Sequence, residues 1–150
     1  MWLLFLFTQR HVTVHKLWGD DGKDLIIKFT GAGDILGHRG LGKKQLHPVS
    51  ATALDDVTAC FIIAEFFETS LAVNAKPAYQ MVLFYAEELQ KAEQNMRNMV
   101  HMNVKSRIAN SIIKLTDIFG TDKNGYLKSN LSRQEIASFA GTTYELFLKY

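Results

Sequence analysis

The chain has 150 residues, a length that fits one ordinary domain or two small ones. Apolar residues make up 47% of it and charged residues 21%, a composition that excludes a disordered chain. The net charge of +2 is unevenly spread, because residues 1–96 hold 9 Lys/Arg and 11 Asp/Glu whereas residues 97–150 hold 8 and 4. The basic excess lies in the C-terminal part, where it would suit a surface that faces phosphates. The alternative is chance, because half of all uneven charge distributions would place the basic excess at this end.

Cys60 is the single cysteine and lies in an apolar run, residues 59–63. One cysteine excludes a disulfide framework, a cysteine-built zinc site and an iron–sulfur cluster within one chain. We therefore predict no metal or cofactor site. A lone cysteine in an apolar run is expected to be a small buried hydrophobe.

Residues 1–7 are apolar but too short to span a bilayer, and they lack the basic region and cleavage site of a signal peptide. They are predicted to form a strand or an atypical chain start. The sequence predicts a cytoplasmic protein with no membrane partner.

The first third of the chain has the alternation and turn signals of short strands. The glycine-rich residues 31–37 are predicted to form tight turns at the edge of a roll. They do not fit a dinucleotide fingerprint, which needs a helix opening at the glycines and an acidic residue about 20 residues on. Strand spacing of this kind indicates a sandwich, roll or barrel. The predicted strands are 11–17 and 24–29, joined by the hairpin turn Asp20-Asp21-Gly22, and 49–54 and 57–63, joined by Asp55-Asp56.

Helices follow from residue 65. A short helix is predicted over 65–73, and a long helix over 78–102 begins after a candidate cap at Asn74 and a proline at Pro77. Apolar positions in the long helix step alternately by three and four residues over three heptads, the pattern of a helix pair. A helix buried against its own domain is the alternative. The regular spacing and a polar residue at its end favour a dimer seam formed by Val82, Tyr85, Leu89, Ala92, Met96, Met99 and Asn103.

The end of the chain has the outline of a helix-turn-helix. An amphipathic helix is predicted over 104–119, then a turn at Lys123-Asn-Gly125 and a strand over 126–131. Ser132 and Glu135 form a capping box that opens the next helix. Gly141 suits the left-handed turn that ends it, and Thr142 or Thr143 can cap the last helix. This order predicts a winged helix that places its last helix in the DNA major groove, with an ordinary αα-hairpin as the alternative.

Residues 11–147 resemble the Crp/Fnr family of bacterial transcription regulators. The resemblance is carried by Asp21-Gly-Lys-Asp-Leu-Ile-Ile with Gly33-Asp-Ile-Leu-Gly, by Lys105-Ser-Arg-Ile-Ala, and by Leu131-Ser-Arg-Gln-Glu-Ile-Ala with Gly141-Thr-Thr-Tyr-Glu. It implies an α+β fold with a partial cyclic-nucleotide-binding-type β-roll over 1–75, a dimerisation helix over 76–103 and a partial winged helix-turn-helix over 104–150.

The resemblance implies a homodimeric regulator of transcription that binds an effector and double-stranded DNA, with RNA polymerase as a further partner. No catalytic motif is present, so an enzyme is not expected. The family's roll begins about forty residues earlier, and the recognition helix stops at Tyr150. We therefore expect a chain truncated at both ends. The alternative function is a ligand-sensing or dimerisation module without DNA binding.

The effector pocket implied by the resemblance departs from the family pattern at three places. Cyclic-nucleotide-binding members have Gly-Glu-Leu-Gly at 37–40, Arg-Ser at 49–50 and Thr-Ser at 92–93. The glutamate that bonds the ribose and the arginine that holds the phosphate are missing here, and a carboxylate at position 93 would repel a phosphate, so cyclic AMP is not expected. Arg39 is the candidate replacement cation, and His38 is expected to be a solvated loop histidine rather than a metal or haem ligand. The pocket residues are Gly37, His38, Arg39, Gly40, Val49, Ser50, Ala92 and Glu93.

The resemblance also assigns the DNA contacts. The base-reading residues are Tyr144, Glu145 and Lys149. The best-known members have arginine at the first of these positions, so Tyr144 implies a different half-site. Glu145 can accept from a cytosine amino group and Lys149 can reach a guanine or a phosphate. The remaining DNA-binding residues, at the starts of the two helices, are Ser132, Arg133, Gln134, Thr142 and Thr143.

Overall fold

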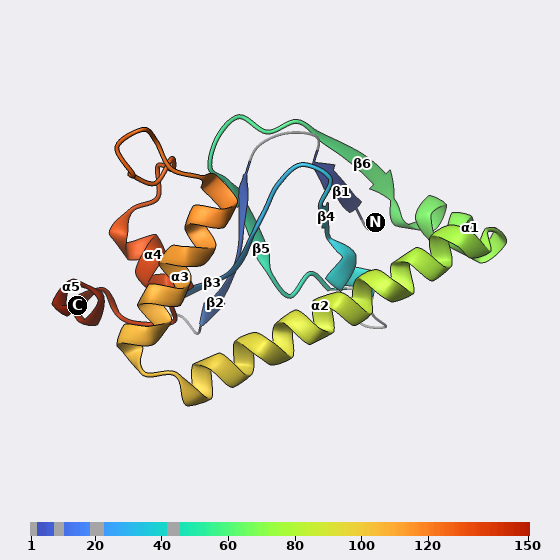
Figure 1. Ribbon diagram of the computed structural model, residues 1–150. Coiled ribbons are helices and arrows are strands. Elements are labelled where there is room, and N and C mark those ends of the chain that lie inside the picture. The colour runs from blue at the N-terminus through green and yellow to red at the C-terminus, as the bar shows by residue number, and fades with distance from the viewer. Residues whose placement is uncertain (1–2, 8–10, 19–22, 42–45) are drawn as a thin grey trace.

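The structure is a computed structural model that describes residues 3–7, 11–18, 23–41 and 46–150. The predicted turn at 20–22 lies outside the described residues. Within the described residues, the strands form two antiparallel sheets of three strands, ordered β4-β1-β6 and β3-β2-β5 (Figure 1). The predicted strands are confirmed with small shifts, and residues 1–7 contain a strand. The strands are β1 (Leu3–Phe7), β2 (Val12–Trp18), β3 (Lys23–Thr30), β4 (Ile35–Leu36), β5 (Ser50–Ala53) and β6 (Ala59–Ile63).

The predicted tight turns at 31–37 are confirmed. The Asp34 amide donates to the Gly31 carbonyl at 3.1 Å, and the Asp34 carboxylate accepts from the Gly31 amide at 2.8 Å. Gly37 has a φ of 84°, a conformation that a side chain would oppose. The next residues form a short 3-10 helix, η1 (His38–Leu41), which carries the residues of the expected effector loop.

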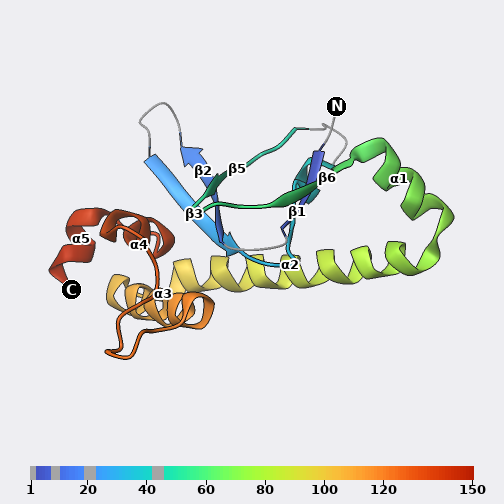
Figure 2. The ribbon, with the colours of Figure 1, turned by 90° about the horizontal axis from the view of Figure 1, so that it is seen from above.

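In the described stretch from residue 64 to residue 150, five α-helices follow the strands. Figure 2 shows α2 as a long rod beside the strands, with α1 at one end and α3, α4 and α5 at the other. The long helix begins three residues earlier than predicted, because Pro77 lies in its first turn, where the missing amide hydrogen costs no hydrogen bond. The helices are α1 (Ala64–Val73), α2 (Ala75–His101), α3 (Val104–Phe119), α4 (Arg133–Phe139) and α5 (Tyr144–Lys149).

Among the side chains that the structure describes, two buried clusters hold these elements together. The first fills the roll with Val12, Val14 and Leu36. The second joins Ile26 and Phe29 of β3 to Leu115 of α3. Residues of the helix-turn-helix pack against this second cluster, so the C-terminal helices share a core with the roll. The partly buried members of the second cluster are Leu54, Phe119, Leu127, Leu131, Ile136 and Phe139.

Two expectations are wrong, one for the burial of Cys60 and one for a strand over residues 126–131. Cys60 is exposed, because its face of β6, an edge strand paired only with β1 among the described strands, is left uncovered. Residues 126–131 do not form a strand. Thr121 and Leu127 make only an isolated bridge, and the Asp122 carboxylate instead accepts the Tyr126 amide at 2.8 Å. A two-stranded hairpin without a third strand is marginal, and Leu127 packs into the second core rather than extending a ladder.

None of the helices in the described part of the chain combines the length and the hydropathy that a membrane crossing needs.

Candidate functional site

The helix-turn-helix forms as its capping pattern predicts. The Ser132 hydroxyl accepts from the Glu135 amide at 3.2 Å, and the Glu135 carboxylate accepts from the Ser132 amide at 2.7 Å. Ala137 is 1% exposed beneath the turn. Gly141 has a φ of 62°, and a Cβ there would collide with the Met99 methyl group. Of the two candidate caps, Thr143 caps α5 by accepting from the Leu146 amide at 3.4 Å.

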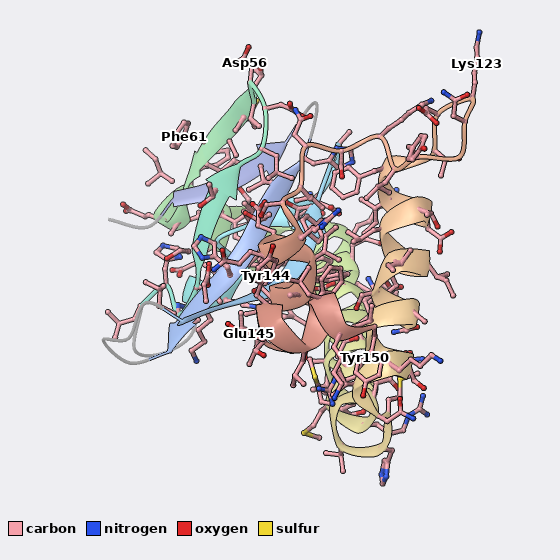
Figure 3. All side chains as sticks on the ribbon, turned by 90° about the vertical axis from the view of Figure 1, so that its left-hand side faces the viewer. Asp56, Phe61, Lys123, Tyr144, Glu145 and Tyr150 are labelled. Carbon is pink, nitrogen blue, oxygen red and sulfur yellow. The ribbon has the colours of Figure 1, made fainter. Side chains whose placement is uncertain are left out.

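The predicted base-reading residues Tyr144, Glu145 and Lys149 are exposed on α5. Figure 3 shows Tyr144 and Glu145 at the end of the molecule that carries α4 and α5. Hydrogen bonds from its own amide and from the Thr143 side chain lower the pKa of Glu145. The carboxylate is therefore charged at neutral pH, as an acceptor for a base amino group must be.

The predicted phosphate-contacting residues open α4. Arg133 and Gln134 are exposed there. The Ser132 hydroxyl also donates to the Glu135 carboxylate at 2.8 Å, so this side chain is engaged by its own cap. Thr142 lies in the turn, where its amide donates to the Ala137 carbonyl at 3.0 Å.

A groove separates the helix-turn-helix from the edge of β3. The Ser138 hydroxyl donates to the Asp24 carbonyl at 2.7 Å and accepts from the Ile26 amide at 2.9 Å, which ties α4 to this strand. The groove has a volume of about 870 Å³. Its walls include six predicted DNA-contacting residues, namely Ser132, Gln134, Thr142, Thr143, Tyr144 and Glu145.

Arg107 of α3 connects the end of α2 to the helix-turn-helix. Its guanidinium donates to the carbonyls of Ala140 at 3.2 Å and Gly141 at 3.1 Å in the turn. The same group donates to the carbonyls of Met102 at 3.3 Å and Met99 at 3.5 Å at the end of α2. Arg107 lies within the motif Lys105-Ser-Arg-Ile-Ala, but this role is not predictable from the sequence, because backbone carbonyl acceptors have no sequence signature.

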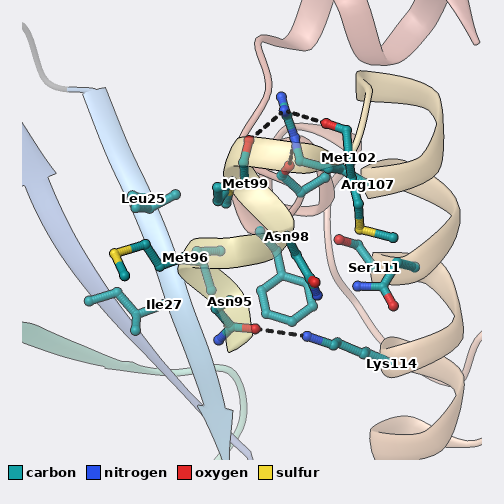
Figure 4. Close-up of a pocket in the computed structure, with 14 residues that line it drawn as sticks. Leu25, Ile27, Asn95, Met96, Asn98, Met99, Met102, Arg107, Ser111 and Lys114 are labelled. Carbon is teal, nitrogen blue, oxygen red and sulfur yellow. Dashed lines mark hydrogen bonds between the residues drawn. The ribbon is translucent and has the colours of Figure 1, made fainter. Parts of the chain in front are cut away.

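Figure 4 shows the cavity of about 180 Å³ beside Arg107, walled by β3, α2, α3 and α4. Lys114 of α3 donates to the Asn95 side chain of α2 at 3.0 Å across one side of it. Met96 and Met99 of the predicted seam also line it. The junction therefore contains residues from the roll, the long helix and the helix-turn-helix.

The predicted seam residues lie on α2 in two different situations. Val82, Leu89 and Met96 are more than 60% exposed, and Ala92 is exposed with them. The others are engaged within their own chain. The Tyr85 hydroxyl donates to the His38 carbonyl at 2.8 Å, Met99 lies under Gly141, and the Asn103 side chain caps α3 by accepting from the Ser106 amide at 2.9 Å.

A second cavity, of about 260 Å³, lies in the roll where the effector pocket was expected. Of the predicted residues, the structure brings together Gly37, His38, Arg39 and Val49 in its wall. Gly40 is buried in η1, and Ser50 starts the exposed strand β5. Ala92 and Glu93 are exposed and lie outside the wall. The remaining lining residues are Val14, Lys28, Leu36, His47 and Ala51.

Lys28 and Glu88, which are not among the predicted site residues, meet beside this cavity. The Glu88 carboxylate lies 3.0 Å from the Lys28 ammonium and 4.0 Å from the Arg39 guanidinium, and its other oxygen lies 3.3 Å from Lys91. Burial favours a raised pKa for Glu88, but the hydrogen bonds and charges of Lys28 and Lys91 outweigh it and lower the pKa. A lysine interrupting the apolar run of residues 25–29 in β3 was the available signal.

His38 is buried at 4% exposure, so the expectation of a solvated loop histidine is wrong. Its Nδ1 lies 3.1 Å from the Ile35 carbonyl and donates to it, while its ring meets Phe84 edge-on at 4.9 Å. Burial lowers the pKa of His38 despite the Ile35 hydrogen bond. The long helix encloses the ring because Phe84 and Tyr85 both point at the loop.

The lowered pKa of His38 predicts a pH dependence of stability. The folded chain takes up this proton less readily than the unfolded chain, whose histidine has the ordinary value of 6.5. The free energy of unfolding should therefore fall as pH drops below about 6.5, until the folded pKa is passed. Urea unfolding across this range measures the slope. His38→Asn should flatten it, whereas His101→Asn, at an exposed position, should not; equal slopes in all three proteins would contradict the assignment.

No family model matches the chain. In sequence, it is 24% identical over 127 residues to the CRP-like cAMP-activated global transcriptional regulator of Mycobacterium tuberculosis, a match that covers 83% of this chain and 57% of that protein. The chain thus spans less than two thirds of the length of this curated relative.

The solved structures show the same relationship in fold. FixK2 from Bradyrhizobium japonicum superposes with a TM-score of 0.80 at 22% identity, covering 98% of this chain and 71% of that one. A CRP-family transcriptional regulator from Thermus thermophilus superposes with a TM-score of 0.77 at 19% identity, covering 98% and 72%. The predicted fold class, a partial β-roll with a long helix and a helix-turn-helix, is confirmed. The neighbours of this chain in sequence and in fold are transcriptional regulators of the Crp/Fnr family, as its motifs indicated.

Proposed function

We propose that the chain is a homodimeric, DNA-binding transcription regulator of the Crp/Fnr type. The observation that carries the proposal is the capped pair α4–α5, with Tyr144, Glu145 and Lys149 exposed on its second helix. In this division, residues 1–75 sense an effector, 76–103 dimerise and 104–150 bind DNA. The protein would act in the cytoplasm, where bacterial DNA lies, with RNA polymerase as a further partner.

A second copy of the chain is the proposed partner of α2. Val82, Leu89 and Met96 form an exposed apolar stripe at heptad spacing. Pairing along this stripe would remove apolar surface from water and relate two α5 helices by a two-fold axis. A two-fold protein reads a palindromic site with one recognition helix in each half.

The proposed effector is not cyclic AMP. The curated relative is named as cAMP-activated, but its ligand does not transfer to this pocket. Val49 lines the cavity at the position of the family's phosphate-binding arginine, and His38 stands in place of the ribose-binding glutamate. Both hydrogen-bonding groups expected for the nucleotide are replaced.

Glu145→Ala should relax base choice at one position in each half-site. A carboxylate that accepts from a cytosine amino group discriminates by about 1–3 kcal/mol, and alanine cannot replace it. Binding selection from randomised half-sites, followed by gel shifts, measures the preference. Asp117→Ala removes an exposed carboxylate from α3 and serves as the control. Unchanged preference in Glu145→Ala would contradict the reading role.

A ligand-sensing or dimerisation module without DNA binding is the second candidate. It is favoured by the attachment of α4 to β3, since the Ser138 hydrogen bonds hold the DNA-contacting residues in a groove shared with the roll. Gel shifts at several salt concentrations separate the two. A salt-dependent complex supports the regulator, because phosphate contacts release counterions. A persistent dimer with no complex at any salt concentration supports the module.

A further inference from the structure

We propose that the roll cavity binds a small aliphatic dianion through Lys28 and Arg39, and that Glu88 competes with this ligand for the same cations. The proposal rests on the effector-binding role proposed above and gives that effector a chemical class. Its basis is the arrangement of charge around the 260 Å³ cavity. Lys28 has no place in the phosphate-binding pattern that the family resemblance implied, and Arg39 is the candidate replacement for its missing arginine.

The cavity wall carries cations without an acid. Its nine lining residues in the described part of the chain include the cations Lys28 and Arg39, and none is aspartate or glutamate. The balancing carboxylate comes from outside the wall, on α2. Glu88 therefore pairs, from outside the cavity, with the same two cations that an anion inside the cavity would contact.

The Glu88 carboxylate is shared by three cations, Lys28, Arg39 and Lys91. Its oxygen at 3.0 Å makes a close pair with Lys28, whereas Arg39 is 4.0 Å away and has no hydrogen bond in the described part of the chain. The Arg39 side chain is only 30% exposed, so water screens it incompletely. A charge in such a place is stabilised by a close partner. A ligand with two negative charges would pair both cations directly.

The shape of the wall restricts the ligand. A volume of 260 Å³ lies below the usual range for drug-sized ligands, which is about 300–1,000 Å³. The apolar part of the wall is aliphatic, formed by Val14, Leu36, Val49 and Ala51. The described wall offers no tyrosine, phenylalanine or tryptophan on which a base could stack. These features fit a short-chain molecule with two acidic groups, either carboxylates or a phosphate.

Ligand binding would release Glu88 from β3. Lys28 lies on β3 and Glu88 on α2, so their 3.0 Å pair connects the roll to the long helix. When a ligand takes Lys28, Glu88 keeps Lys91, its neighbour one turn further along the same helix. The effector would thereby loosen a contact between the cavity and the helix that carries the proposed seam.

Isothermal titration of the full chain with succinate, glycerol 2-phosphate and neutral succinamide tests the proposal. Wild type should bind one or both anions and not succinamide. Glu88→Gln should bind the anion about tenfold more tightly, because it removes the competing charge. Lys28→Gln and Arg39→Gln should each bind it about tenfold more weakly. Glu87→Gln makes the same change on an exposed neighbour and should match wild type.

Circular dichroism establishes that each variant is folded, and the two cation variants provide independent readings if one of them unfolds. Succinate and glycerol 2-phosphate distinguish a carboxylate effector from a phosphate one. No anion binding by folded Glu88→Gln, or equal binding by Glu88→Gln and Glu87→Gln, would overturn the proposal whatever the gel shifts show. Anion binding in the expected order supports it even if DNA binding fails, so the two proposals are tested separately.

Discussion

Replacing Leu115 with alanine is expected to lower the free energy of unfolding by about 2–5 kcal/mol. Leu115 of α3 is fully buried and packs with Ile26 and Phe29 of β3. The Phe29 ring is held edge-on by Phe119 at 5.4 Å and Phe139 at 4.9 Å, so it cannot move to fill the cavity. Urea unfolding followed by circular dichroism measures the loss.

The shared core also predicts how the chain unfolds. Because this cluster joins β3 to the C-terminal helices, Leu115→Ala should shift one cooperative transition. Ile113→Ala is the matched control on the same helix, where the side chain is 60% exposed, and should cost less than about 1 kcal/mol. Two separated transitions, with the roll unaffected by Leu115→Ala, would show that the roll and the C-terminal helices have independent cores.

Most helices were predictable because their signals are local. Periodic apolar residues and the terminator Gly120 gave α3 its bounds residue for residue. The Ser132–Glu135 capping box lies within four residues and specified the start of α4 in the same way. The strands were predicted from alternation, but which strands pair was not. Residues 49–54 and 57–63 lie next to each other in sequence, yet β5 and β6 belong to different sheets.

Features decided by tertiary neighbours could not be predicted in this way. His38 is buried because α2, nearly fifty positions later, covers it with Phe84 and Tyr85. Lys28 and Glu88 are 60 residues apart, and no periodicity relates a strand lysine to a helix glutamate. The resemblance instead indicated residues 92–93, one turn further along the same helix. The prediction that Cys60 is buried was wrong for a related reason. An apolar run does not show which face of its strand the rest of the chain leaves uncovered.

Arg107→Ala is expected to weaken DNA binding by about tenfold or more and to destabilise the turn between α4 and α5 by roughly 2 kcal/mol. The guanidinium donates to two carbonyls of this turn, Ala140 and Gly141, which alanine would leave without this donor. Hydrogen exchange at residues 140–147 reports the loosening directly, and gel shifts report its effect on affinity. Arg97→Ala removes an equal charge from α2, where the guanidinium makes a long 3.5 Å contact to the Asn98 side chain, and is the control.

Arg107→Lys distinguishes geometry from charge. A planar guanidinium reaches acceptors on two segments at once, here the turn and the end of α2 at Met102, whereas a lysine ammonium is a compact point charge. Lysine should therefore restore less than half of the lost protection from exchange. Full restoration would mean that a positive charge near the turn is sufficient. Because exchange is measured without DNA, faster exchange in Arg107→Ala supports the positioning role whether or not the chain binds an operator.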